Sequence, residues 1–199
     1  MGEAAASRRL FVALKLGEER GRTVAAAVRA SLGIGEREDV PRHLRLYGAR
    51  DLHVTLFFLG ATVEPQLAAL AAALGAATQG LEAPELEIAA AGAFPDARRP
   101  RILWLGVRER GPARLARVHH AVHEAATSLG FQADARPFTA HITVARVRAD
   151  RGGLARIPPA YFALDPQLRW KPGAVELVES LQGGGGDAYR SVRSWAWAN

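Results

Sequence analysis

The sequence predicts an α+β fold made of two similar lobes with a groove between them. A four-residue pattern, His-apolar-Thr-apolar, occurs twice, at His53–Leu56 and at His141–Val144. Each copy comes third in the same order of elements, after a strand and a helix. We therefore expect one domain over residues 1–199, with pseudo-repeat lobes built around residues 9–91 and 101–197. Each lobe should have a mainly antiparallel sheet with helices on its outer face.

The elements of the first lobe are apolar runs and helical repeats bounded by turn residues. The predicted strands are Arg9–Leu14, Leu52–Leu59 and Leu86–Ala90. A first helix over Glu18–Leu32 ends at Gly33, where glycine favours a helix stop. A second helix runs to about Thr78, with Thr62 as its N-cap and Pro65 in its first turn. Residues 92–100 contain two prolines and are expected to form the loop that joins the lobes.

The second lobe repeats this order and adds a final hairpin. The predicted strands are Arg101–Val107, Ala140–Val147, Ala174–Leu181 and Tyr189–Trp197. A helix opens at Pro112 and ends at Gly130, and one face of it is apolar. The expected core positions on that face are Leu115, Val118, Val122, Ala125 and Leu129. The glycine run 183–186 is expected to form the turn of the final hairpin.

The composition is that of an ordinary folded protein, with 49% hydrophobic and 23% charged residues. The chain has no cysteine, which excludes disulfides and thiolate metal sites and fits a reducing compartment. No apolar run approaches the roughly 18 residues of a membrane span, and residues 1–9 do not resemble a signal peptide. We expect a cytoplasmic protein that has no membrane partner.

The formal net charge of +6 favours an anionic partner, with nucleic acid as the first candidate. The abundance of Arg, Ala and Gly offers a second explanation, because a GC-rich genome produces the same excess without selection for binding. The charge alone leaves both explanations open.

The residue types of the repeated motif are suited to acid–base chemistry on a phosphate. Side chains alternate across a strand, so His53 and Thr55 share one face, as do His141 and Thr143. Histidine can give or take a proton near neutral pH, and a hydroxyl can donate to a phosphate oxygen. Two such patches facing each other could hold one phosphate between an acid and a base. Because the motifs are nearly interchangeable, the sequence leaves open which histidine is which.

Extended strings around both motifs resemble the two-histidine (2H) phosphoesterase superfamily. Within it they are most similar to the bacterial RNA 2',3'-cyclic phosphodiesterases, historically called 2'-5' RNA ligases. The matching strings are RLFVA at 9–13, FLG at 58–60, ILWLG at 102–106, RPFTAHIT at 136–143 and YRSVRSW at 189–195. The resemblance implies that both motifs lie on central strands facing across a groove. It also implies metal-independent hydrolysis of RNA 2',3'-cyclic phosphate ends to 2'-phosphomonoesters.

The same resemblance implies roles for individual residues. His141 would be the general base and His53 the general acid, while Thr55 and Thr143 would donate to the non-bridging oxygens. Arg146 matches a family arginine and is a candidate phosphate ligand; the alternative is a solvated surface arginine. Simple alternation places it on the face opposite His141, unless the strand bulges or ends near Val144.

Aromatic residues are candidates for stacking on a nucleobase. Phe11 is the family-matched candidate, and a plain core position is an equal alternative. The other aromatic residues considered are expected to be core: Phe57, Phe94, Trp195 and Trp197.

A histidine cluster in the second-lobe helix is not expected to bind a metal. His119, His120 and His123 lie away from the apolar stripe, and neither a third ligand nor the glutamate of a zincin motif is evident. We expect no cofactor and a monomer whose partner is RNA with a 2',3'-cyclic phosphate end, tRNA fragments included. Three alternatives remain: 2'-5' ligation of tRNA halves, action on a small cyclic phosphate, and an RNA-binding module without catalysis.

Overall fold

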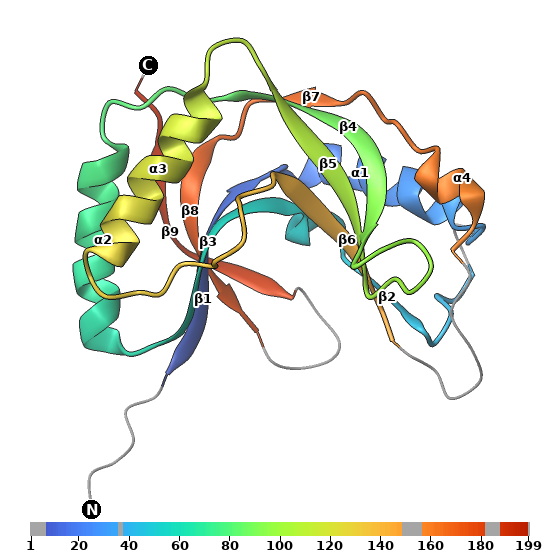
Figure 1. The fold of residues 1–199 in the computed structure, drawn as a ribbon, viewed down its shortest axis with the longest axis horizontal. Helices are drawn as coiled ribbons and strands as arrows, with labels where there is room; N and C mark the ends of the chain where they lie inside the picture. Colours follow the sequence, from blue (N-terminus) through green and yellow to red (C-terminus); the bar gives the residue numbers. More distant parts are fainter. Residues whose placement is uncertain (1–6, 36–37, 149–156, 182–187, 199) are drawn as a thin grey trace, which may run out of the picture.

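A computed structural model of the protein describes residues 7–35, 38–148, 157–181 and 188–198. Its strands form one curved antiparallel sheet in the order β7-β4-β5-β6-β3-β1-β8-β9, with β2 paired to β6 (Figure 1). The strands are β1 (Arg8–Lys15), β2 (Leu44–Leu46), β3 (His53–Thr62), β4 (Glu85–Phe94), β5 (Ile102–Arg110), β6 (His141–Val147), β7 (Arg169–Trp170), β8 (Ala174–Ser180) and β9 (Tyr189–Ala196). The α+β class and the antiparallel sheet are thus confirmed.

The helices pack on two flanks of this sheet (Figure 1). They are α1 (Glu18–Ser31), α2 (Glu64–Thr78), α3 (Arg114–Thr127), the short α4 (Pro159–Phe162) and the 3-10 turn η1 (Ala49–Asp51). Helices α2 and α3 lie against each other and contact β9 and β3, respectively. Helix α1 lies against η1 and α4, and α4 contacts β4. None of these helices combines the length and apolar character of a membrane span within the described residues.

The sheet is continuous, and its two halves meet where β3 pairs with β6 through Val54 and Ile142. Strand β4, expected in the first lobe, pairs with β5 because the two form an antiparallel hairpin. Strands β8 and β9, expected in the second lobe, extend the sheet from β1. Strand pairing therefore crosses the ranges 9–91 and 101–197, and the division into two lobes stays a prediction.

Two predicted helix ends are wrong for local reasons. Strand β3 continues through the buried Thr62, so Val63 becomes the N-cap of α2, and its N–H donates to Gln66 Oε1 at 3.1 Å. Helix α3 ends at Thr127, so Leu129 no longer follows the helical spacing and is 40% exposed instead of core. The other four predicted core positions on α3 are buried.

The remaining differences concern short or irregular segments. Strand β4 continues to Phe94, so only the second part of the expected loop 92–100 is irregular. The elements β2, β7, η1 and α4 have two to four residues each, too few for a periodic pattern. Phe57 is core as predicted, and Trp195 and Trp197 pack half-buried against the core. The predicted glycine turn 183–186 lies outside the described residues.

A close contact fixes α1 to the segment that leads into the first motif. Gly21 of α1 is buried against Ala49 of η1, and an added Cβ would collide with the Ala49 carbonyl. Gly21→Ala should therefore lower the free energy of unfolding by about 1–3 kcal/mol, although alanine favours a helix. Urea denaturation measures this change, with the neighbouring exposed Arg22→Ala as control. An unchanged or raised midpoint for Gly21→Ala would contradict the contact.

Candidate active site

Both His-x-Thr motifs lie on the same face of the sheet at the junction of its halves. Val54 of β3 and Ile142 of β6 are direct partners, and both are fully buried. Their chain neighbours point to the opposite face and are half-buried: His53, Thr55, His141 and Thr143. An antiparallel register through Val54 and Ile142 places His53 beside Thr143 and Thr55 beside His141. The junction thus collects two imidazoles and two hydroxyls in one polar patch.

The two imidazoles are held in the same way. His53 Nδ1 lies 2.5 Å from the Asp51 carbonyl oxygen, and His141 Nδ1 lies 2.7 Å from the Thr139 carbonyl oxygen. Because a carbonyl can only accept, Nδ1 carries the proton in each ring. This leaves Nε2 of each neutral ring with a free lone pair. Each histidine therefore presents Nε2 as the nitrogen that can accept or deliver a proton.

His53 sits in an aromatic enclosure. The Phe11 ring stacks on it with centroids 4.8 Å apart, and the Tyr189 ring meets it edge-on at 5.0 Å. The pKa of His53 is lowered to about 4, chiefly by burial, with smaller electrostatic contributions from Lys15 and His141. The hydrogen bond to the Asp51 carbonyl opposes this shift. His53 is therefore neutral at neutral pH when no anion is bound.

Asp51 supports His53 from behind, and sequence reasoning missed it. Its side chain is buried, and its Oδ1 accepts the Ala188 N–H at 3.0 Å. Its carbonyl accepts from His53, so one residue connects the start of β9 to the imidazole. The only signal in the sequence is an acidic residue directly before a predicted strand, because neither its burial nor its distant partner Ala188 is visible there.

His141 also has aromatic neighbours. Phe94 and Trp104 meet its ring at centroid distances of 5.3 and 6.4 Å. Trp104 lies over Gly92, where any side chain would collide with the indole. Phe94 was predicted to be core, but it is half-buried at the site, because β4 extends far enough to reach His141.

Arg146 reaches the face of the motifs because β6 contains a bulge. Leu103 pairs with Ala145 but Trp104 with Thr143, so Val144 is an extra residue in β6. Simple strand alternation places Arg146 on the face of His141 only if the strand bulges or ends near Val144, and this bulge is present. Its Nε donates to the Tyr47 hydroxyl at 2.8 Å, and Tyr47 stacks on Tyr189 with centroids 5.7 Å apart. Tyr189 in turn contacts His53, so the arginine is connected to the first motif.

Of the pair Phe11 and Phe58, it is Phe58 whose side chain is open to a ligand. Phe11 is 3% exposed, whereas Phe58 is 65% exposed. The two residues are partners in the β1–β3 register, with ring centroids 6.2 Å apart. Simple alternation could not assign the consecutive pair Phe57-Phe58, because a bulge in β3 sets which of them faces the site.

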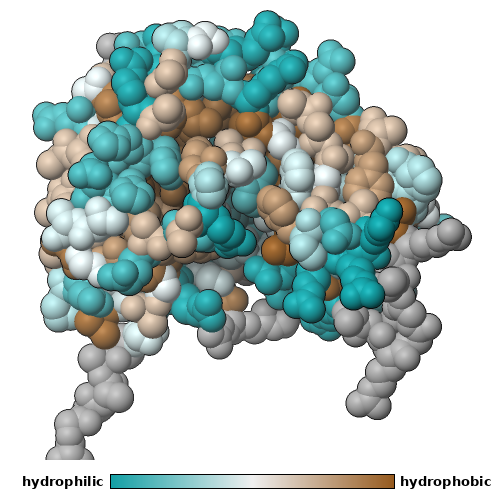
Figure 2. All heavy atoms as spheres, viewed as in Figure 1, coloured by the Kyte–Doolittle hydropathy of each residue, from teal (hydrophilic) through white to brown (hydrophobic). Residues whose placement is uncertain are grey.

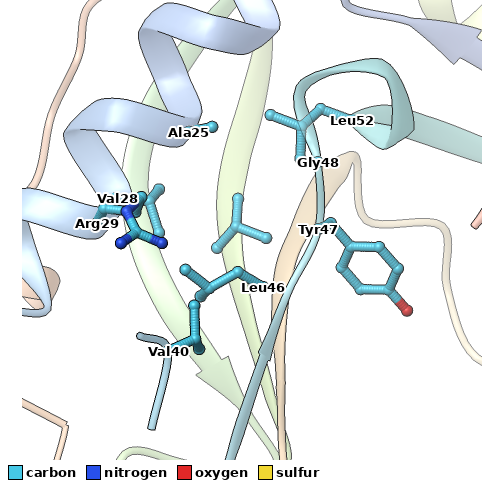
Figure 3. A pocket seen from close by; sticks show the side chains of 9 residues that line it. Ala25, Val28, Arg29, Val40, Leu46, Tyr47, Gly48 and Leu52 are labelled. Atoms are coloured by element: carbon cyan, nitrogen blue, oxygen red, sulfur yellow. The ribbon is translucent and has the colours of Figure 1, made fainter. Parts of the chain in front are cut away.

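Two further features lie apart from the motifs. His119 stacks on Phe138 at 4.0 Å and His123 meets Phe57 at 5.8 Å, and of the three α3 histidines only His120 is exposed. Within the described ranges no group of three or more metal-ligating side chains is found. An apolar cavity of about 320 Å³ lies between α1, β2 and β6 and contains neither motif histidine (Figure 3).

Several known proteins resemble this chain in sequence. A family model described as the 2'-5' RNA ligase superfamily matches residues 21–184. An RNA 2',3'-cyclic phosphodiesterase of Archaeoglobus fulgidus is 37% identical over 111 residues, which are 56% of this chain and 60% of that protein. One of Geobacillus stearothermophilus is 42% identical over 96 residues, 48% of this chain and 30% of that protein. The matches thus span at most 60% of these two relatives.

Solved structures match over almost the whole chain. E. coli LigT complexed with 3'-AMP has a TM-score of 0.71 at 25% identity, covering 98% of this chain and 100% of the other. The TT0787 protein of Thermus thermophilus has a TM-score of 0.73 at 26% identity, covering 94% of this chain and 97% of the other. The family model and these folds confirm the resemblance seen in the motifs, and the chain belongs to the 2'-5' RNA ligase superfamily.

Proposed function

We propose that this protein hydrolyses RNA ends bearing a 2',3'-cyclic phosphate to 2'-phosphomonoesters without a metal ion. The observation that carries the proposal is the shared face of the two imidazoles, each presenting Nε2 and each accompanied by a threonine. The names of the curated relatives, RNA 2',3'-cyclic phosphodiesterase, support the same reaction.

In this mechanism one water attacks phosphorus in line with the departing 3'-oxygen. His141 Nε2 takes the proton from the water, and His53 Nε2–H delivers a proton to the 3'-oxygen as its bond to phosphorus breaks. The products are a 2'-phosphate and a 3'-hydroxyl. The enclosure of His53 by Phe11 and Tyr189 favours this assignment, because the attacking water needs the more open side, at His141.

To act as an acid, His53 must be protonated, and binding of the anionic substrate favours this protonated form. A phosphate anion beside the ring favours the imidazolium and opposes the effect of burial. Thr55, Thr143 and Arg146 would stabilise the negative charge that develops on the non-bridging oxygens. Phe58 would stack on the nucleobase, while Phe11 supports His53 from below.

His53→Ala and His141→Ala should each lower kcat for 2',3'-cyclic AMP by about 10²–10⁴-fold, because each removes one proton-transfer group. Product analysis by chromatography measures the turnover and should find 2'-AMP only. His120→Ala is the matched control, since His120 lies exposed on α3. Activity should persist in EDTA; a requirement for added metal would overturn the mechanism.

Phe58→Ala should raise KM for a cyclic-phosphate-ended substrate by about tenfold with little change in kcat. Stacking on an aromatic side chain contributes about 1–3 kcal/mol per base. The exposed position predicts an unchanged melting temperature, whereas Phe11→Ala should lower it because Phe11 is buried. An unchanged KM for Phe58→Ala would exclude Phe58 from base recognition.

His53 should titrate near pH 4 in the ligand-free protein, as followed by NMR of its ring protons. Because this pKa lies below the unfolded value of about 6.5, the folded state binds fewer protons in that window. Stability should therefore fall as the pH drops from about 6.5 to 4, and less so in His53→Gln. Saturating inorganic phosphate should raise the pKa of His53. A pKa that stays near 4 with phosphate bound would contradict the acid role.

A further inference from the structure

Two arginines face each other across β2 and β6. Arg45 and Arg146 are direct partners in the register, so their side chains share a face with Cβ atoms about 4.5–5.5 Å apart. Like charges placed directly opposite each other destabilise a sheet. In the described part of the chain neither guanidinium has an ion pair with Asp or Glu. Such a pair is stabilised when an anion binds between the two guanidinium groups.

One tyrosine holds both arginines. The Tyr47 hydroxyl accepts from Arg146 Nε at 2.8 Å, and the Arg45 guanidinium lies 5.9 Å from the centre of the Tyr47 ring. The Tyr47 ring is fixed in turn by stacking on Tyr189. Its hydroxyl points away from the apolar cavity behind the sheet (Figure 3). Within the described residues Arg146 donates a side-chain hydrogen bond only through Nε, so its two terminal nitrogens are available to a ligand.

The pair lies beside the motif patch, further along β6. From His141 and Thr143 the strand continues through the bulge to Arg146, and Arg45 is the next residue across. Figure 2 shows hydrophilic residues gathered over β2 and the neighbouring ends of β5 and β6. An RNA strand that approaches the polar patch of the two motifs from this side therefore meets Arg45 and Arg146 first.

We propose that Arg45, together with Arg146, binds the phosphodiester that joins the terminal nucleotide to the rest of the RNA. This proposal rests on the function proposed above and names its substrate: an oligonucleotide ending in a cyclic phosphate, in preference to a cyclic mononucleotide. Arg146 lies between the two phosphates, whereas Arg45 contacts only the internal one. The ligand class follows from the chemistry, because planar guanidinium groups pair with phosphate oxygens in two-pronged hydrogen bonds.

The test compares 2',3'-cyclic AMP with the dinucleotide ApA ending in a 2',3'-cyclic phosphate. Wild-type protein should favour the dinucleotide in kcat/KM. Arg45→Gln should lower kcat/KM for the dinucleotide by about tenfold, mainly through KM, as expected when a charged hydrogen bond is lost. Arg45→Gln should leave kcat/KM for cyclic AMP unchanged. For the dinucleotide, it should reduce the slope of log KM against log salt concentration by the amount of about one phosphate contact. The matched control is Arg117→Gln, which removes the same charge from the exposed face of α3.

A binding measurement separates this subsite from catalysis. ApA without a terminal phosphate has the internal phosphodiester but cannot be hydrolysed at the patch, and adenosine lacks both phosphates. NMR titration should show ApA binding more tightly than adenosine in wild type, with this difference lost in Arg45→Gln and reduced in Tyr47→Phe. If Arg45→Gln lowered kcat/KM equally for both cyclic substrates, or lowered it for neither, the proposed subsite would be overturned. Failure of wild type to hydrolyse either substrate would instead overturn the proposed function, while the ApA titration still decides the subsite.

Discussion

The pairing of Val54 with Ile142 is the contact on which the rest of the site depends. These two apolar side chains are buried on the helix-covered face, and their burial forces the alternate residues onto the opposite face. A slip of one residue would turn His53 and Thr55 toward the core and remove half of the site. The packing free energy of the core therefore sets the direction of the polar groups as well as the stability of the sheet.

The two histidines share a backbone contact but lie in different surroundings. Both rings donate Nδ1–H to the carbonyl two residues earlier, which gives them the same orientation. His53 is enclosed by aromatic rings and supported by the buried Asp51, whereas His141 lies closer to solvent. Different surroundings for equal residues are a general way to separate an acid from a base.

Local pattern was sufficient to predict much of this arrangement. The face shared by His53 and Thr55, and that shared by His141 and Thr143, follows from strand alternation alone. What could not be predicted depends on contacts between distant segments or on bulges. The extra residue Val144 turns Arg146 toward the site, and a bulge in β3 exposes Phe58 rather than Phe57. Strand β2, with Tyr47 directly after it, is too short to leave a periodic signal.

A crystal structure with the product 2'-AMP would show whether both imidazoles contact one phosphate. We expect phosphate oxygens within hydrogen-bond distance of Nε2 of His53 and Nε2 of His141, with the hydroxyls of Thr55 and Thr143 on the remaining oxygens. A phosphate bound by only one of the two histidines, or bound away from the junction of β3 and β6, would contradict this expectation.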